Sequence, residues 1–237
     1  MPGATLNGAG FFGKVSSHGD FVSRRLPSSF TGKWDAWLQA SMRCSRQTLG
    51  AAWVDAYLTA PIWRFALAAG ICGPSAWAGV LMPSVDCVGR YFPLTVAMAL
   101  PGDVALLDLA EAGNDWYARL ESLMLSSLDR RFTLDHFDAA LRATAMPALG
   151  RAQSRQKEAA RHGFLRLAIP GLDGLPMAMP DLSRLIAEAS MDGRSAWWSQ
   201  GSNWVEPSMV LCCGLPGEAA FTAMLKGFLE QGGVAPQ

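Results

Sequence analysis

Residues Tyr91 to Leu100 read Y-F-P-L-T-V-A-M-A-L and form the clearest structural pattern in the chain. Side chains of two kinds alternate, which is the period of a β-strand with two different faces. One face carries Phe92, Leu94, Val96, Met98 and Leu100, and the other carries Pro93, Thr95, Ala97 and Ala99. Two strands are predicted upstream, at Ile62 to Ala69 and Trp77 to Met82. Because short loops join the three strands, we expect them to pair largely antiparallel.

Helices are predicted on both sides of this region in the sequence. Apolar residues at helical spacing indicate a helix from about Thr31, its expected N-cap, to Leu49. The other predicted elements are strands at Gly10 to Val15, Phe21 to Leu26, Phe164 to Ile169, Ser195 to Ser199 and Ser208 to Cys213, and helices at Ala51 to Leu58, Asn114 to Leu128, Thr133 to Thr144 and Glu218 to Glu230. This irregular alternation favours an α/β fold with α+β character, in which helices cover both faces of a mixed, mostly antiparallel sheet.

A chain of 237 residues fits one large domain. We expect that domain over residues 1–231, with its segments at 8–101, 113–146 and 194–231, and a disordered tail at 232–237. Half of the residues are apolar and only 17% are charged, against about 25% charged in an average soluble protein. Either the core is large, therefore, or some apolar surface is reserved for a partner.

Composition also excludes several classes of protein. The net charge of zero argues against a nucleic-acid binder that works by phosphate neutralisation. No signal peptide is recognisable, and the apolar run from Leu94 to Leu100 is too short to span a bilayer. The five cysteines are odd in number and lack a C-x-x-C pair, which is typical of a reducing compartment. The three scattered histidines lack ligand spacing to cysteine, so we expect no metal site.

The string G-A-G-F-F-G-K at Gly8 to Lys14 matches two nucleotide-binding signatures formally. It is a G-x-G-x-x-G fingerprint, and it is a phosphate-binding loop with Val15 in place of Ser or Thr. Both motifs need a buried strand before the glycines and a helix directly after them. Here a loop sequence, Val15 to Asp20, follows. We therefore expect no nucleotide and no other cofactor, and interpret Gly10 and Gly13 as sites of close approach in an aromatic strand.

A hydrolytic site could be drawn from Ser84, His18 and either Asp20 or Asp86, but the chain has no G-x-S-x-G elbow. The simpler interpretation is a hairpin connection in which Ser84 and Asp86 bond to their own backbone. Charged residues near strand ends are expected to form structural ion pairs between loops, with a polar recognition surface as the alternative. These residues are Lys14, Asp20, Arg24, Arg64, Asp86 and Arg90.

Two further features leave alternatives open. Trp197 and Trp198 point to opposite sides of a strand, so both are core if helices cover both faces, and one is a partner anchor if a face is open. The basic stretch from Arg151 to Arg166 is interpreted as a solvated helix face or linker, with a polyanion site as the alternative.

Taken in order, several segments resemble one family of proteins. These are G-F-F-G-K at 10–14, G-D-F-V-S-R at 19–24, W-D-A-W-L-Q at 34–39, P-I-W-R-F at 61–65, G-V-L-M-P-S-V-D at 79–86 and V-G-R-Y-F-P-L-T at 88–95. Together they resemble the TagF (ImpM) family of accessory proteins in bacterial type VI secretion clusters. The resemblance is dense over the first hundred residues and weaker afterwards. One departure is Ser16-Ser17-His18, where the family pattern has a proline and no histidine, which argues against a role for His18.

The resemblance implies a three-layer α/β/α domain and a cytoplasmic, non-enzymatic regulator. Such proteins act after translation to hold back assembly or firing of the secretion machine, through a forkhead-associated-domain scaffold protein. A phosphatase, fused in some relatives, would be a separate protein here. The family's most distinctive residues are expected to form one polar-aromatic surface, either locking the fold or binding the partner. They are Lys14, Asp20, Arg24, Trp63, Arg64, Ser84, Asp86 and Arg90.

Overall fold

Seven strands form one sheet in the order β2-β1-β5-β4-β3-β6-β7. The computed structural model describes residues 8–101, 104–146 and 190–228, together with the single positions 180, 183, 186 and 187. The strands are β1 Gly10–Gly13, β2 Val22–Arg24, β3 Trp63–Leu67, β4 Trp77–Met82, β5 Leu94–Ala99, β6 Arg194–Ser199 and β7 Ser208–Cys213. Every described strand pair is antiparallel, so this sheet carries no parallel pair within the described ranges.

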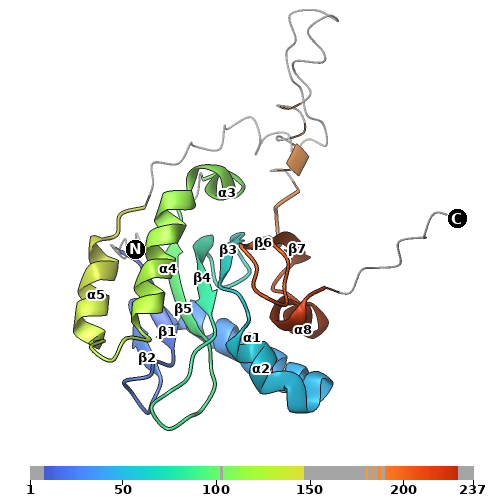
Figure 1. Cartoon of the computed structure of the whole chain (residues 1–237). Helices are drawn as coiled ribbons and strands as arrows, with labels where there is room; N and C mark the ends of the chain where they lie inside the picture. The colour runs from blue at the N-terminus through green and yellow to red at the C-terminus, as the bar shows by residue number, and fades with distance from the viewer. Residues whose placement is uncertain are drawn as a thin grey trace, which may run out of the picture.

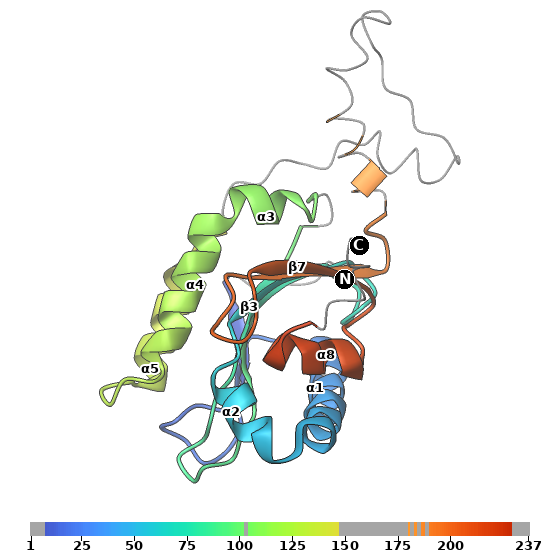
Figure 2. The same ribbon diagram turned by 45° about the vertical axis from the view of Figure 1, so that its right-hand side comes forward.

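Helices cover both faces of the sheet, and the three-layer α/β/α fold is confirmed (Figures 1 and 2). One face carries α1 (Ser28–Leu49), the 3₁₀ turn η1 (Gly50–Ala52), α2 (Trp53–Leu58) and α8 (Glu218–Lys226). The other face carries α3 (Asp108–Ala112), α4 (Asn114–Ser126) and α5 (Leu134–Ala143). Among the described residues, no helix has both the length and the apolar character that crossing a membrane requires.

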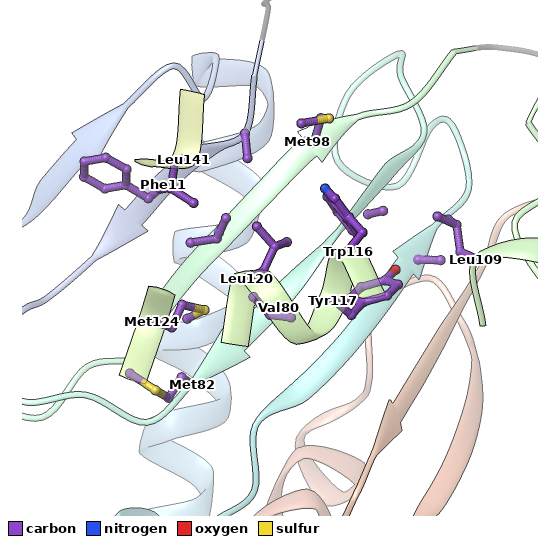
Figure 3. Close-up of a cluster of buried hydrophobic side chains, with 14 of the residues drawn as sticks. Phe11, Val80, Met82, Met98, Leu109, Trp116, Tyr117, Leu120, Met124 and Leu141 are labelled. Carbon is purple, nitrogen blue, oxygen red and sulfur yellow. The ribbon is translucent and has the colours of Figure 1, made fainter. Parts of the chain in front are cut away.

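The alternation along β5 divides the interior into two cores. Leu94, Val96 and Met98 face α4 and α5, where α4 presents its apolar side to the sheet (Figure 3). The residues of α4 that make this contact are Trp116, Tyr117, Leu120 and Met124. Phe92 departs from the predicted face, because β5 begins at Leu94 and Phe92 packs with the opposite core before the strand starts.

The opposite core, under α1 and α8, is aromatic. Trp34 packs against both Phe65 and Trp197, with ring centroids 4.9 and 5.9 Å away. Its indole N–H donates to Thr95 Oγ1 at 2.8 Å, so the buried polar atom is satisfied. Trp197 is fully buried here, whereas Trp198 is half-buried on the other face, 5.0 Å from Tyr117. Both tryptophans therefore pack within the layers, as expected for a sheet covered on both faces.

Most element boundaries agree with the sequence, and two predicted ends are wrong. The Thr133 side chain caps α5 as expected, accepting from the His136 N–H. Thr31 is not the cap of α1: the helix begins at Ser28 after Pro27, and the Thr31 hydroxyl donates to the Pro27 carbonyl. The last helix ends at Lys226 rather than Glu230. The predicted strand at 164–169, the basic stretch at 151–166 and the tail at 232–237 lie outside the described residues.

The expected close approach at Gly10 and Gly13 is confirmed. A Cβ atom at Gly10 would lie 2.6 Å from the Arg24 carbonyl oxygen, and one at Gly13 would lie 2.1 Å from the Pro93 carbonyl oxygen. Gly13 also has a φ of 141°, which L side chains rarely adopt. Phe11 and Phe12 between them point to opposite cores. The glycines thus let an aromatic strand approach its neighbours closely, and a loop and then β2 follow them, with α1 beginning only at Ser28.

We predict that Trp197→Ala lowers the free energy of unfolding by about 3–5 kcal/mol, because a large side chain leaves a cavity in a packed aromatic core. Trp204→Ala is the matched control, since Trp204 is 63% exposed, and should change stability by no more than about 0.5 kcal/mol. Urea denaturation of both variants measures the difference. Equal losses would contradict the described packing.

Candidate functional site: a buried charge network beneath two loops

Two loops meet at one end of the sheet (Figure 1). The first loop, residues 14–21, joins β1 to β2, and the second loop, residues 83–93, joins β4 to β5. Lys14 from the first loop donates from Nζ to Asp86 Oδ2 of the second at 2.6 Å. Both side chains are buried, with exposed fractions of 7% for Lys14 and 0% for Asp86. A buried ion pair is stable only when further hydrogen bonds satisfy the remaining donors of the cation and the remaining lone pairs of the anion.

The Asp86 carboxylate is fully satisfied by the two loops. Its Oδ1 accepts from the backbone N–H groups of Val88 and Arg90 at 3.0 and 2.9 Å, and its Oδ2 also accepts from Arg90 Nε at 2.7 Å. Burial alone would raise the pKa of Asp86, but the hydrogen bonds from Lys14, Arg90 and Val88 outweigh burial and hold the pKa well below its ordinary value. The carboxylate is therefore ionised at neutral pH and serves as the centre of the network.

Further hydrogen bonds join the two loops through their backbones. The Arg90 guanidinium donates to the Gly19 carbonyl, and the Cys87 N–H donates to the His18 carbonyl at 3.1 Å. Ser84 donates from its hydroxyl to the Lys14 carbonyl at 2.7 Å, so the expected bond to its own loop is wrong. Asp86 does bond to its own loop, as expected.

The second loop is also fixed to α2. The Tyr57 hydroxyl donates to the Ser84 carbonyl and accepts from the Ser84 N–H, both at 2.9 Å. Burial raises the pKa of Tyr57 far above its ordinary value, so the hydroxyl keeps the proton that it donates. Tyr91, at the end of the loop, packs edge-on against Tyr57. The network therefore links three elements: the first loop, the second loop and α2.

Phe21 covers the network from the first loop. Its ring lies 4.7 Å from the Phe92 ring and 5.6 Å from the Phe12 ring, and Lys14 Nζ lies 5.2 Å from its centroid. The side chain is nevertheless 48% exposed. The ring thus covers the Lys14 ammonium while about half of the side chain remains accessible to solvent.

Of the other four predicted site residues, Asp20 lies in the first loop and three lie elsewhere, so the eight do not share one surface. Arg64 forms a bidentate pair with Glu121 of α4 at 2.6 and 2.9 Å. Trp63 faces the opposite core and donates to the Met224 carbonyl of α8 at 3.1 Å. Arg24 pairs with Asp135 and Asp138 rather than with Asp20. Asp20 is exposed, and its carboxylate makes no ion pair within the described part of the chain.

Sequence reasoning missed one network altogether. Arg25, which has a φ of 59°, donates to the Ala9 carbonyl and pairs with Asp138. The same carboxylate accepts from Arg142, which lies one turn further along α5. The i,i+4 spacing of Asp138 and Arg142 is a readable signal. The pairing of Arg25 with a residue 113 positions away is not, because only the fold brings them together.

The geometry does not assemble the candidate hydrolytic site. The Ser84 hydroxyl is buried and occupied by the Lys14 carbonyl. The His18 ring is exposed and bonds through Nδ1 to the neighbouring Ser17 hydroxyl at 2.9 Å. Among the described residues, no hydrogen bond joins Ser84 to His18, and no group of three metal-ligating side chains occurs. The network holds the two loops against each other.

We predict that Asp86→Asn destabilises the protein, because the amide loses the ion pair and turns a donor toward Lys14 or a backbone N–H. The pKa of Asp86 is lowered from 3.8 on folding, so its stabilising contribution is present above that value and is lost as the pH falls toward the folded pKa. The difference in unfolding free energy between wild type and variant should therefore be constant from about pH 7 to pH 5 and shrink below about pH 4. Guanidinium denaturation across this range measures it. A difference independent of pH would contradict the lowered pKa.

Comparisons with known proteins agree with this architecture. The model of the TagF N-terminal domain, type VI secretion system-associated, matches residues 10–144, which is more than half of the chain. The crystal structure of PA0076 from Pseudomonas aeruginosa PAO1 is similar over 97% of this chain and 99% of that one, with 40% sequence identity and a TM-score of 0.81. No curated protein matches the chain. The chain therefore belongs to the TagF family of type VI secretion system-associated proteins.

Proposed function

We propose that this protein is a non-enzymatic regulator that restrains a type VI secretion system after translation. It does so in the cytoplasm by binding the forkhead-associated-domain scaffold protein of that system, in the manner that the resemblance to TagF (ImpM) implies. The observation that supports this proposal is the pair of loops held in place by the Lys14–Asp86 network, whose tips project to solvent.

The network gives the two loops the properties of a binding surface. A loop that is already ordered loses little conformational entropy on association, so more of its contact energy appears as affinity. Here Asp86 fixes the second loop through two backbone N–H groups and Arg90 fixes the first through the Gly19 carbonyl. Binding residues commonly lie on such loops, positioned by a rigid scaffold.

The exposed tips have a composition suited to a protein partner. Val88 is 66% exposed at the tip of the second loop, and about half of the Phe21 side chain is exposed in the first. His18 and Asp20 surround them with polar groups, and more than half of the Arg90 side chain is accessible. Apolar side chains within a polar rim are typical of interfaces between proteins. The buried members of the network, Lys14 and Asp86, hold this surface in shape without touching the partner.

A binding role also accounts for the state of the polar groups. Each strong candidate for chemistry already has a partner inside the protein: Ser84 has the Lys14 carbonyl, Asp86 has four donors, and Arg64 has Glu121. A catalytic side chain instead needs a donor, acceptor or nucleophilic atom that is free to contact the reacting atoms. The proposal therefore assigns these residues to structure and the exposed loop tips to recognition.

We predict that Val88→Asp weakens binding of the purified full-length chain to the purified scaffold protein at least tenfold, because a charge would be buried at the centre of the contact; tenfold corresponds to about 1.4 kcal/mol. Leu211→Asp is the matched control, since Leu211 is 52% exposed on β7 at the far edge of the sheet, and should change the Kd less than about twofold. Isothermal titration calorimetry measures both.

In cells, replacement of the wild-type chain by Val88→Asp should increase secretion, because restraint is lost while the folded protein persists. Thermal denaturation of the purified variant confirms folding, and the Leu211→Asp strain should secrete at the wild-type level. The absence of any binding between the wild-type chain and the scaffold would contradict the proposed partner. Lower secretion on deletion of the wild-type chain would contradict the proposed restraint.

A further inference from the structure

We infer that a pocket at the corner between α1 and α2 binds a carboxylate side chain of the protein partner. This inference rests on the proposed function, because it names a second part of the same contact surface. The pocket has a volume of about 280 Å³ and is lined by Arg46, Gly50, Trp53, Val54 and Tyr91. Arg46 lies outside the segments that resemble the TagF family.

Arg46 is a guanidinium on an aromatic platform without an internal anion. Three cations lie over aromatic rings within the described ranges: Lys14 over Phe21, Arg64 over Tyr117, and Arg46 over Trp53 and Tyr91. Lys14 is neutralised by Asp86 and Arg64 by Glu121. Arg46 forms no ion pair and no side-chain hydrogen bond with any residue that the structure describes.

The stacking geometry prepares Arg46 for a carboxylate. Its guanidinium carbon lies 4.2 Å from the centroid of the Trp53 ring and 6.0 Å from that of the Tyr91 ring. A guanidinium on an aromatic face keeps its N–H donors in a planar fork that matches the two oxygens of a carboxylate. Arg64 shows this chemistry inside the same protein, where the fork binds both oxygens of Glu121. Arg46 offers the same fork to solvent.

The aromatic floor of the pocket is rigid. Trp53 is buried, donates from its indole N–H to Ser45 Oγ at 2.9 Å, and stacks on Tyr57 with centroids 4.8 Å apart. Tyr91 packs against Trp53 and forms a backbone bridge with Val85 across the second loop. The loop that the Asp86 network fixes therefore supplies one wall of the pocket, so the pocket and the loop tips are held by the same interactions.

The surroundings of the pocket indicate what accompanies the carboxylate. Val54 and Leu58 are exposed and lie four residues apart, so they share the outward face of α2. The lining residues of the pocket include no acidic group that would repel an anion. A segment that carries an aspartate or glutamate next to apolar side chains would satisfy both features. We assign the pocket to such a segment of the scaffold protein.

The position of Arg46 also has a purely structural explanation, which the experiment must separate from binding. Arg46 lies in the last turn of α1, where a cation is favoured by the carbonyl groups at the helix end. Arg43 lies one turn earlier on the same helix, is exposed, and belongs to no pocket lining described above. It is therefore the matched control for a change of charge on this helix.

The test measures the Kd between the full-length chain and the purified, non-phosphorylated scaffold protein for three variants. Arg46→Glu should raise the Kd at least about tenfold, because it places two carboxylates together. Arg46→Lys keeps the charge but loses the planar fork, so we expect a smaller, intermediate loss. Arg43→Glu should change the Kd by less than about twofold. Thermal denaturation of each variant shows that the fold is retained.

The outcomes distinguish this inference from the proposed function. If the wild type and Arg46→Glu bind the scaffold equally well, the inference is wrong and the proposed function stands. If the wild type does not bind at all, the proposed function is wrong and the pocket has no partner to accept. Equal losses for Arg46→Glu and Arg43→Glu would reduce the effect to general charge repulsion and overturn the assignment. Binding that requires phosphorylated scaffold and disappears after phosphatase treatment would assign the pocket to a phosphoryl group instead of a carboxylate.

Discussion

A buried ion pair between Lys14 and Asp86 holds one end of this molecule together. The pair joins the residue that follows β1 to the connection between β4 and β5, and Arg90 extends it to the first loop. Removal of Asp86 would leave Lys14 as an unpaired charge in the interior, which is among the most destabilising changes that a single residue can cause. The two loops can therefore project from the sheet in one conformation, although neither contains regular secondary structure at its tip.

The described part of the fold contains few buried charges, and those that the two cores enclose are paired. Helices cover both faces of the sheet, so most strand residues face one of two apolar cores and the chain needs few charges. The charges that do lie inside are paired across elements, Arg64 with Glu121 and Arg25 with Asp138. Arg46 lies at the surface, where it is stacked on Trp53 and forms no ion pair with a described residue. A guanidinium that is stacked on an aromatic ring without an internal anion can bind an anion of a partner.

Local patterns in the sequence predicted most helices and strands. They could not predict contacts between residues that are far apart in the chain. Period-two alternation predicted β5, and the loop sequence after Gly13 predicted that no helix begins directly after the glycines, as the structure has it. The Asp86–Arg90 pair was readable because it is local. Glu121 and Asp138 were missed because their partners lie 57 and 113 residues away in the chain. The eight candidate residues were expected to share a surface because the segments resemble one family, but β3 directs Trp63 and Arg64 to opposite faces.

Hydrogen–deuterium exchange of the full-length chain, with and without the scaffold protein, tests whether the loops fixed by Lys14 and Asp86 form the contact surface. When the scaffold is bound, we expect slower exchange of backbone amides in residues 16–21, 86–91 and 46–58, with little change along β7. Protection confined to β7, where Met209 and Leu211 are half exposed, or protection at α3 to α5 alone, would contradict this contact surface.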